Sequence, residues 1–433
     1  MSKPQNIAVI GAGIAGLGSA WLLSREHRVT LFEAGDYLGG HTNTVEVSLE
    51  GHTHPVDTGF LVFNERTYPN LIALFAQLGV PSVETEMSFS VSLEQPYLEW
   101  AGSSLATVFG QKRNLLRRDF WRMLADIVRF NRESQAWLLA PDRIEYTLDE
   151  YLRAGGYSRA FSEWYLLPMA AAIWSCPTGQ MLATPLSTFI RFCQNHGLLQ
   201  VFDRPLWRTV KGGGREYVRR IAAELPHIRI ASPVHAVRPQ VGGVRVVTAS
   251  SDEVFDQVVL ACHSDQALAL LGEAATSRQA AVLGAIRYQP NRAVLHTDPR
   301  LLPRDQRLWS AWNYLAGKGQ PGEQPVSVSY LINRLQPLPF KTPVMVSLNP
   351  VREPRDEHVL AEFDYAHPIF DGPAIQAQAA LPLVQGENGI WLAGAWGGYG
   401  FHEDGLKSAL AVANALGVKA PWQGGEAVRR GAA

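Results

Sequence analysis

Residues 6–33 read NIAVIGAGIAGLGSAWLLSREHRVTLFE, and the order of features in this stretch decides the fold. Asn6–Ile10 and Arg28–Phe32 are short, largely apolar runs of the kind that a parallel sheet buries on both faces. A GxGxxG turn and a helical segment at Leu17–Arg25 lie between them. Glycines interrupt the apolar run Ile7–Leu23, whereas a signal peptide or a membrane-spanning helix would be continuously apolar. The stretch therefore predicts the strand–helix–strand unit of a doubly wound α/β sheet.

The glycines of the turn have separate physical tasks. Gly11 permits the tight turn, Gly13 lets the backbone approach a diphosphate, and Gly16 lets the helix pack closely on the strand. The N-terminus of the helix offers free N–H groups to the phosphates, and Glu33 at the end of the second strand can accept hydrogen bonds from a ribose. This unit alone does not distinguish NAD from FAD. Its candidate cofactor-binding residues are Gly11, Gly13, Ile14, Ala15, Gly16, Glu33 and Ala34.

A second pair of glycines follows the acidic residue and favours FAD. Gly39 and Gly40 allow a further close approach of the backbone, which a diphosphate extended by a ribityl chain requires at this point. Val56–Phe60 continues the same region with another glycine. The candidate cofactor-binding residues here are Gly39, Gly40, His41, Thr42, Gly59 and Phe60.

The C-terminal part predicts one more strand and helix. Gly389–Ala393 is expected to be the last parallel strand, Asp404 the N-cap of the helix, and Gly417 the glycine that ends it. Such a helix directs backbone N–H groups at its start, expected at Gly405 and Leu406, toward whatever lies over the sheet. Gly394, Asp404, Gly405 and Leu406 are therefore candidate cofactor-binding residues, and Trp396, Tyr399, Phe401 and His402 are expected to form walls of the pocket.

The motifs resemble those of the flavin-containing amine oxidoreductase superfamily, which includes monoamine oxidases, protoporphyrinogen oxidase and carotenoid desaturases. Beside the N-terminal motif, the glycines of Val210–Arg215 and the closing segment Ile390–Gly405 match that superfamily. More narrowly, Asn195–Leu199 and Gly400–Gly405 resemble a bacterial branch described as predicted NAD/FAD-binding, amine-oxidase-like proteins. Some members of that branch have been linked to the modification of fatty acyl chains.

The resemblance implies an α/β fold with a discontinuous Rossmann-like FAD-binding domain and an inserted α+β substrate domain. In the resembled fold, the strand that contains Val234 pairs with the adenine. The start of the closing helix faces the pyrimidine edge of the flavin, where N–H groups stabilise the charge of the reduced ring. The expected FAD-binding domain comprises residues 1–75, 210–271 and 381–420, the substrate domain comprises 76–209 and 272–380, and 421–433 is expected to be a flexible tail.

The chain departs from the superfamily pattern at His41, where an arginine commonly follows the double glycine. Arginine is a permanent cation that contacts a diphosphate with two parallel hydrogen bonds, and a neutral histidine cannot fully replace it. Arg66 or Arg215 is a candidate source of the missing charge. The closing segment also lacks the cysteine of covalent flavin attachment, so non-covalent FAD is expected.

The implied function is that of an FAD-dependent oxidoreductase whose substrate delivers a hydride to flavin N5. The apolar segment Leu166–Trp174 and the narrower resemblance favour dehydrogenation or desaturation of a lipid or fatty acyl chain. One alternative is an amine oxidase with an aromatic cage formed by Trp396 and Tyr399, and another is a non-catalytic flavin-binding redox sensor. The electron acceptor stays open. The candidate catalytic residues are His402, Tyr399, Trp396, His196 and Lys341.

Composition excludes several other classes. The 39 Lys and Arg and 40 Asp and Glu among 433 residues give a net charge of −1, which argues against a nucleic-acid-binding protein. The three cysteines occur singly, so neither a disulfide framework nor a metal site is expected, and a reducing cytoplasm fits best. Residues 112–133 form a basic amphipathic segment. It is expected either to contact an anionic membrane peripherally or to be a solvated helix packed on its own domain.

Overall fold

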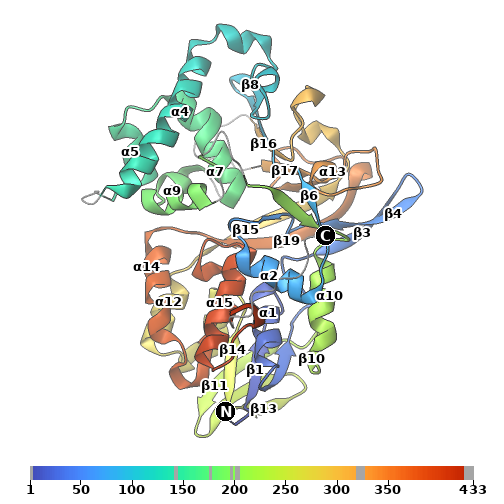
Figure 1. Ribbon diagram of the computed structural model, residues 1–433, viewed down its shortest axis with the longest axis vertical. Helices are drawn as coiled ribbons and strands as arrows, with labels where there is room; N and C mark the ends of the chain where they lie inside the picture. The colour runs from blue at the N-terminus through green and yellow to red at the C-terminus, as the bar shows by residue number, and fades with distance from the viewer. Residues whose placement is uncertain are drawn as a thin grey trace.

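The structure is a computed structural model that describes residues 3–140, 145–174, 178–195, 198–199, 205–317 and 327–423. Two bodies follow one another along the long axis of the molecule, and Figure 1 shows β1 and α1 in the lower body and α4, α5 and α7 in the upper one. Within the described ranges, no helix is both long enough and apolar enough to cross a bilayer.

A five-stranded parallel sheet forms the centre of the lower body. Its order, β10-β2-β1-β14-β20, brings together strands that are far apart in the sequence. The strands predicted for this sheet at Asn6–Ile10, Arg28–Phe32 and Gly389–Ala393 are present as β1, β2 and β20. The strands are β1 (Asn6–Ile10), β2 (Arg28–Phe32), β10 (Ile228–Arg229), β14 (Gln257–Leu260) and β20 (Ile390–Leu392).

Alternating side chains of β1 explain why the sheet is covered on both faces. Ile7 and Val9 pack in the core with helices α1 (Ile14–Leu23) and α15 (His402–Ala415), whereas Ala8 and Ile10 belong to a second core on the opposite face. The second core also contains apolar residues of an antiparallel sheet and of three helices. These elements are β11 (Val234–Gln240), β12 (Gly243–Thr248), β13 (Asp252–Phe255), α11 (Ser264–Leu271), α12 (Ser277–Gly284) and α14 (Gly372–Ala380).

The packing of α12 and α14 bears on two of the expected domain boundaries. Both helices fall within the expected substrate domain, but Val282, Leu283, Ala374 and Ala377 pack in the second core of the parallel sheet. Figure 1 accordingly shows α12 and α14 beside α15 in the lower body. Burial of their apolar faces thus places the two helices, which lie inside the expected boundaries at 271 and 381, against the parallel sheet.

A seven-stranded mixed sheet, β19-β15-β18-β17-β16-β7-β8, forms the base of the upper body. Strands β7 and β8 pair antiparallel within it. The strands are β7 (Phe89–Glu94), β8 (Tyr97–Ala101), β15 (Tyr288–His296), β16 (Trp312–Ala316), β17 (Ser327–Leu331), β18 (Met345–Leu348) and β19 (Val359–Pro368).

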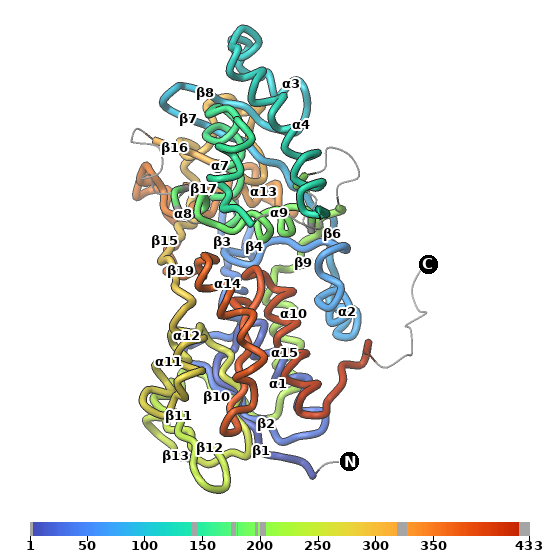
Figure 2. The backbone as a smooth tube through the Cα atoms, turned by 90° about the vertical axis from the view of Figure 1, so that its left-hand side faces the viewer, coloured from blue at the N-terminus to red at the C-terminus, as the bar shows by residue number. Residues whose placement is uncertain are grey.

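Helices of the upper body pack together at one end of this sheet (Figure 2). The basic segment at 112–133 is two elements and not one, because η1 (Lys112–Leu116) ends at the extended residue Arg117 before α4 (Arg118–Leu139) begins. The segment expected in the interior is buried as α7 (Leu167–Trp174). The other helices are α3 (Leu105–Val108), α5 (Leu148–Ala154), α6 (Arg159–Phe161), the π-helical η2 (Ser162–Leu166), α8 (Thr178–Leu182), α9 (Leu186–Asn195) and α13 (Ile332–Leu335).

Several elements connect the two bodies. The expected boundary at 75 falls inside helix α2 (Pro69–Leu78), so the chain does not change domain there. The expected flexible tail is also partly ordered, since Trp422 stacks on Trp21 and donates a hydrogen bond to Asn70. Residues 424–433 lie outside the described part. The remaining elements are β3 (Thr44–Leu49), β4 (His52–Asp57), β5 (Phe63–Asn64), β6 (Ser82–Thr85), β9 (Trp207–Val210), α10 (Arg215–Glu224) and the 3₁₀ turn η10 (Pro421–Gln423).

Candidate functional site

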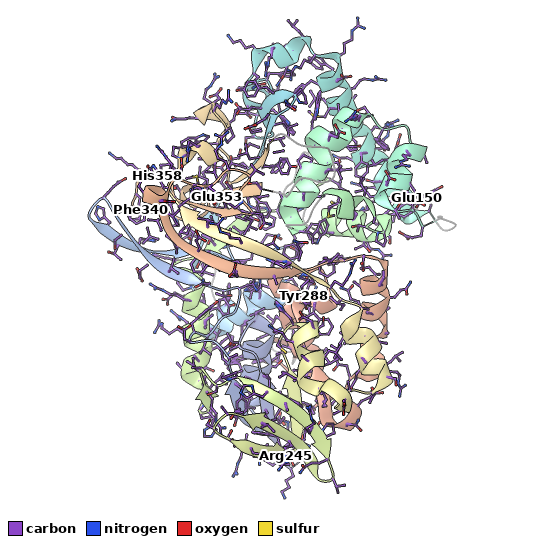
Figure 3. The ribbon with its side chains drawn as sticks, turned by 180° about the vertical axis from the view of Figure 1, so that it is seen from behind. Glu150, Arg245, Tyr288, Phe340, Glu353 and His358 are labelled. Atoms are coloured by element: carbon purple, nitrogen blue, oxygen red, sulfur yellow. The ribbon has the colours of Figure 1, made fainter. Side chains whose placement is uncertain are left out.

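A cavity of about 1220 Å³ extends from the C-terminal ends of β1, β2 and β14 into the upper body. This edge is where open α/β sheets bind nucleotides. Figure 3 shows Tyr288, one of the lining residues, at the level where the two bodies meet. The volume lies at or above the upper end of the range usual for small-molecule sites, so it accommodates a dinucleotide together with a substrate.

The turn at the start of α1 has the shape that a diphosphate requires. A Cβ atom added to Gly13 would meet nothing within 4 Å, so the backbone there faces open cavity. A Cβ on Gly40 would lie 3.2 Å from Cα of Gly13, which places the second glycine pair directly against the first. The first-turn N–H groups of α1 have no intrahelical acceptor. The two glycine motifs therefore form a cradle that fits the diphosphate of FAD.

Glu33 lines the cavity at the end of β2. Its Oε2 accepts a 2.7 Å hydrogen bond from the N–H of Ala12, and its Oε1 accepts one of 2.8 Å from the N–H of Gly35. These two bonds fix the carboxylate, and each oxygen keeps a further lone pair that can accept a ribose hydroxyl.

Most of the predicted cofactor-binding residues converge on this cavity, although they come from distant segments. Gly16 and Thr42 do not line it among the described residues: a Cβ on Gly16 would lie 1.7 Å from the Gly11 carbonyl oxygen, so this glycine serves helix packing. The predicted residues that do line it are Gly11, Gly13, Ile14, Ala15, Glu33, Ala34, Gly39, Gly40, His41, Gly59, Phe60, Val234 and Gly394.

The start of α15 differs from the prediction. The N-cap is Phe401 and not Asp404, which occupies the third helical position and accepts a 3.1 Å hydrogen bond from the N–H of Phe401. The N–H of Gly405 donates to the Phe401 carbonyl and is not free. Asp404, Gly405 and Leu406 are not among the described lining residues. The N–H groups that have no intrahelical acceptor belong instead to the first residues of the helix, His402 and Glu403.

His402 lines the cavity as part of a buried hydrogen-bonded group. Its Nε2 lies 2.8 Å from Oγ1 of Thr42 and 3.2 Å from the hydroxyl of Tyr217, and its ring stacks on Phe60 with 3.7 Å between centroids. Burial lowers the pKa of His402 to about 3. The imidazole is consequently neutral at physiological pH and is a weak base, while Thr42 acts by positioning it.

The other candidate catalytic residues differ in where they lie relative to the cavity. Trp396 and Tyr399 line the cavity, but the indole N–H of Trp396 donates to the Cys262 carbonyl and the ring of Tyr399 packs on Phe192. The prediction of Lys341 is wrong: this exposed residue lies outside the described lining, and its backbone N–H donates to Glu50. His196 lies outside the described residues.

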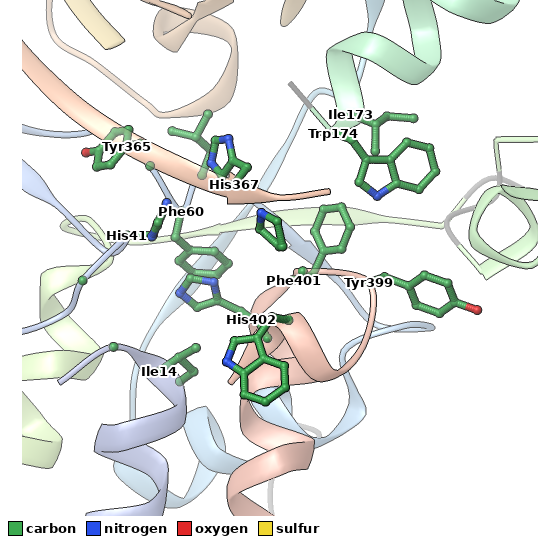
Figure 4. A pocket seen from close by; sticks show the side chains of 18 of the residues that line it. Ile14, His41, Phe60, Ile173, Trp174, Tyr365, His367, Tyr399, Phe401 and His402 are labelled. Atoms are coloured by element: carbon green, nitrogen blue, oxygen red, sulfur yellow. The ribbon is translucent and has the colours of Figure 1, made fainter. Parts of the chain in front are cut away.

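A cluster of three histidines is the main feature that the sequence analysis missed. The ring of His41 lies 5.2 Å from that of His367 and 6.2 Å from that of His263, measured between centroids, and it stacks on Tyr365 at 5.0 Å. Figure 4 shows His41, Tyr365 and His367 together on one side of the cavity. Because the three histidines come from three distant segments, no local pattern indicated the cluster. Among the described residues, no group of His, Cys, Asp and Glu is arranged to hold a metal.

The expected replacements for the missing arginine do not reach the site. Arg215 forms a 2.5 Å ion pair with Glu46, and Arg66 is exposed. Neither is among the described lining residues, which include no lysine or arginine at all.

The part of the cavity inside the upper body has apolar and aromatic walls. The indole nitrogens of Trp174 and Trp312 are buried in these walls and have no hydrogen-bond partner among the described residues. The apolar and aromatic wall residues from this body are Met87, Phe89, Trp100, Tyr165, Met169, Ala172, Ile173, Trp174, Phe192, Leu198, Leu206, Trp312, Tyr330 and Leu348, and its polar lining residues are Thr85, Glu86, Ser88 and Ser103.

Comparisons with known proteins agree with this geometry. The family model described as "Flavin containing amine oxidoreductase" matches residues 14–330. An L-amino-acid oxidase from Bungarus fasciatus is 49% identical over 51 residues, which are 12% of this chain and only 10% of that protein. The curated relatives are thus matched over a small part of their own length.

Three solved structures share the fold. A putative protoporphyrinogen oxidase from Exiguobacterium has a TM-score of 0.68 at 18% identity, covering 96% of this chain and 99% of that one. A fatty acid isomerase from P. acnes that produces CLA has a TM-score of 0.68 at 15% identity, with 96% and 100% covered. Cyclohexylamine oxidase from Brevibacterium oxydans has a TM-score of 0.67 at 17% identity, again with 96% and 100% covered.

Proposed function

Because the chain belongs to the flavin-containing amine oxidoreductase family, we propose that this FAD-dependent oxidoreductase dehydrogenates a lipid substrate, such as a fatty acyl chain. The observation that carries the proposal is the apolar wall of the cavity in the upper body. No lysine or arginine is among the described lining residues, and the acidic ones are Glu33 and Glu86. Glu33 belongs to the nucleotide end, and Glu86 is ion-paired with Arg334. Burying a charged substrate here would be costly, whereas burying an acyl chain is favourable.

Two indole N–H groups that have no hydrogen-bond partner among the described residues support the same proposal. Trp174 and Trp312 line the cavity among mainly apolar residues, and their indole nitrogens are buried. A buried donor without a partner costs about 1–3 kcal/mol, and a carbonyl or carboxyl oxygen of the substrate would remove that cost. We therefore assign the acyl oxygen to these indoles.

The residues of the chain bind and orient the reactants. FAD would be held non-covalently by the glycine cradle, by Glu33 and by the strand that starts at Val234, and the bound flavin supplies the acceptor for a hydride. The neutral His402, stacked on Phe60, fixes one wall. The aromatic lining excludes water and holds the substrate carbon in position.

An amine substrate is the alternative within the same family. The fold itself serves both kinds of substrate, since a fatty acid isomerase and cyclohexylamine oxidase both share it. An aromatic cage of Trp396 and Tyr399 has less support, because these rings pack against different neighbours. An amino acid has the least support, because both of its charged groups flank the reacting carbon and would be buried with it, and the described lining contains no cationic side chain.

The test is anaerobic mixing of the purified yellow protein with fatty acids, acyl phospholipids and amines, followed by the visible absorbance of the oxidised flavin. Bleaching by acyl compounds and not by amines is the expected result. Trp312→Phe, which removes the N–H and keeps an aromatic ring, should raise KM for acyl substrates about tenfold with less effect on kcat. Bleaching by amines alone would overturn the lipid proposal, and no bleaching by any compound would favour a redox sensor.

We also propose a peripheral contact with anionic membranes through η1 and the first turns of α4. Leu115, Leu116, Trp121 and Val128 are exposed apolar side chains of this segment. Basic side chains are exposed on the same segment, namely Lys112, Arg113, Arg118 and Arg122. Apolar and basic groups together are typical of surfaces that lie on an anionic bilayer. Such a contact would deliver a lipid substrate to the upper body.

A further inference from the structure

The described lining of the cavity contains no permanently charged cation that could neutralise the diphosphate of the cofactor. That lining contains no lysine or arginine, and its side chains that can become cationic are His41, His263, His367 and His402. A histidine carries charge only when it is protonated, and small changes in its surroundings decide whether it is.

His41 differs from the other three histidines in the state of one ring nitrogen. Its Nε2 is buried and has no hydrogen-bond partner within the described part of the chain. The backbone holds the ring beside the glycine cradle, since the His41 carbonyl accepts a 2.8 Å hydrogen bond from Phe60 and the preceding Gly40 lies against Gly13.

Of the other three histidines, His367 and His402 have a ring nitrogen within hydrogen-bond distance of a partner, and His263 has a stacking partner. Nδ1 of His367 lies 2.9 Å from the side-chain amide nitrogen of Asn291, which also donates to a backbone carbonyl. Nδ1 of His367 is therefore the acceptor in this hydrogen bond. The ring is consequently neutral and carries its proton on Nε2. His263 stacks on Tyr288 with 4.4 Å between centroids, and His402 bonds to Thr42 and Tyr217.

We propose that His41 takes up a proton when the diphosphate of FAD enters the cavity. Protonated His41 then serves as a pH-dependent cation at the position where the resembled superfamily has an arginine. The inference depends on FAD binding and not on the identity of the substrate, so it stands or falls independently of the lipid proposal.

The surroundings of His41 keep it neutral in the absence of a ligand. Burial, and then the neighbouring His367, His263 and His402, lower its pKa well below the usual value. Other ionisable groups around this region are the phenols of Tyr365, Tyr37 and Tyr288, the thiol of Cys262, and the carboxylates of Glu33, Asp265 and Asp57. A diphosphate adds negative charge, which favours the charged imidazole and raises its pKa in the complex.

The sign of the pH dependence follows from this difference. The complex binds a proton more tightly than the free chain does, so affinity for FAD rises as pH falls from the pKa of the complex toward that of the free chain. If one proton is taken up, the dissociation constant of FAD changes by up to about tenfold per pH unit between the pKa of the free chain and that of the complex. Above the pKa of the complex, the dissociation constant no longer changes with pH.

The first test measures FAD binding by the flavin-free full-length chain, through flavin fluorescence between about pH 6 and 9. The wild type should bind more weakly as pH rises. His41→Arg should bind tightly with little pH dependence, and His41→Gln should bind weakly with little pH dependence, since both lack the titrating ring. His52→Gln, which alters an exposed histidine on β4, is the matched control and should retain the wild-type slope.

The second test measures protons directly, by calorimetry in buffers of different ionisation enthalpy. FAD should be bound with uptake of a fraction of a proton that His41→Arg abolishes, whereas riboflavin, which lacks the diphosphate, should be bound without uptake. If the flavin cannot be removed reversibly, the rate of FAD release from the holoenzyme is measured instead. This rate should increase with pH in the wild type, and it should not change with pH in His41→Arg or His41→Gln. A pH-independent wild type, or a His41→Arg variant that keeps the full slope, would overturn the proposal.

Discussion

At the scale of single residues, the second and third glycines of the GxGxxG turn, Gly13 and Gly16, have the different roles that the motif predicts. A Cβ on Gly13 would enter open cavity, whereas a Cβ on Gly16 would collide with the backbone oxygen of Gly11 at 1.7 Å. Gly13 also has an ordinary φ of −69°, so alanine is conformationally allowed there. One glycine therefore makes room for a ligand, and the other makes room for the fold.

Gly13→Ala should consequently fold normally and lose affinity for FAD. A methyl group in the cradle would displace the diphosphate from backbone donors that are worth about 1.5–3 kcal/mol each, which corresponds to a loss of roughly tenfold to a hundredfold. Titration of the flavin-free chain with FAD measures the loss, and the melting temperature of that chain should be unchanged. Gly16→Ala should show the opposite pattern, with destabilisation of about 3 kcal/mol or failure to fold. Equal FAD affinity of Gly13→Ala and wild type would place the diphosphate elsewhere.

At the scale of elements, a buried carboxylate joins helix α15 to helix α2. Glu403 is only 3% exposed, and its Oε1 accepts a 2.6 Å hydrogen bond from the Asn70 side chain while its Oε2 accepts one of 3.0 Å from the N–H of Leu71. These donors belong to the first turn of α2, where N–H groups lack intrahelical acceptors and negative charge is favoured. The start of the closing helix is thereby fixed against a helix from the other end of the chain.

Glu403→Ala should therefore reduce the free energy of unfolding by about 2–4 kcal/mol, because it leaves buried donors of α2 without partners. Urea denaturation monitored by circular dichroism measures the change. Glu403→Gln should cost less, since its amide oxygen still accepts one bond. Glu65→Ala is the control, because Glu65 is exposed and its 3.9 Å contact with Arg208 should contribute less than about 1 kcal/mol. A loss no larger than that of the control would show that Glu403 does not fix α2.

At the scale of the whole molecule, exposed apolar side chains gather on the helical end of the upper body. Leu116 is 89% exposed, and Leu115, Trp121 and Val128 are exposed on the same segment. Figure 2 shows α3 and α4 at this end, away from the nucleotide-binding sheet. A membrane contact there would leave the lower body free in solution.

If this surface binds membranes, association with vesicles should require anionic lipid and should decline as salt is added, because the basic side chains act through screened charge. The double variant Leu116→Ser and Trp121→Ser should bind roughly tenfold more weakly, since it removes the apolar anchors. Vesicle co-sedimentation measures both effects. Leu383→Ser, at a site that is 69% exposed in the lower body, is the control and should bind like the wild type. Equal binding to neutral and anionic vesicles would argue for a solvated helix.

Local sequence signals determined the nucleotide-binding half of this protein. The strands, the glycine turns and Glu33 are short-range features, each of which depends on backbone geometry within a few residues, and the structure contains them as predicted. Asp404 was misassigned by the same reasoning, because an acidic residue suits both the N-cap and the third helical position, and only the packing of Phe401 and His402 decided between them.

Only the tertiary structure decided which distant groups meet. It brought His41, His263 and His367 to one edge of the sheet, kept Arg215 and Lys341 away from the cavity, and placed α12 and α14 with the nucleotide-binding body. The physical reason is that charged and apolar side chains interact with whatever lies near them in space. Which distant segments lie near one another is set by the topology of the fold and cannot be read from a local pattern. A sequence pattern can state that an arginine is absent from its usual place, but the groups that surround the vacated position are known only once the chain is folded.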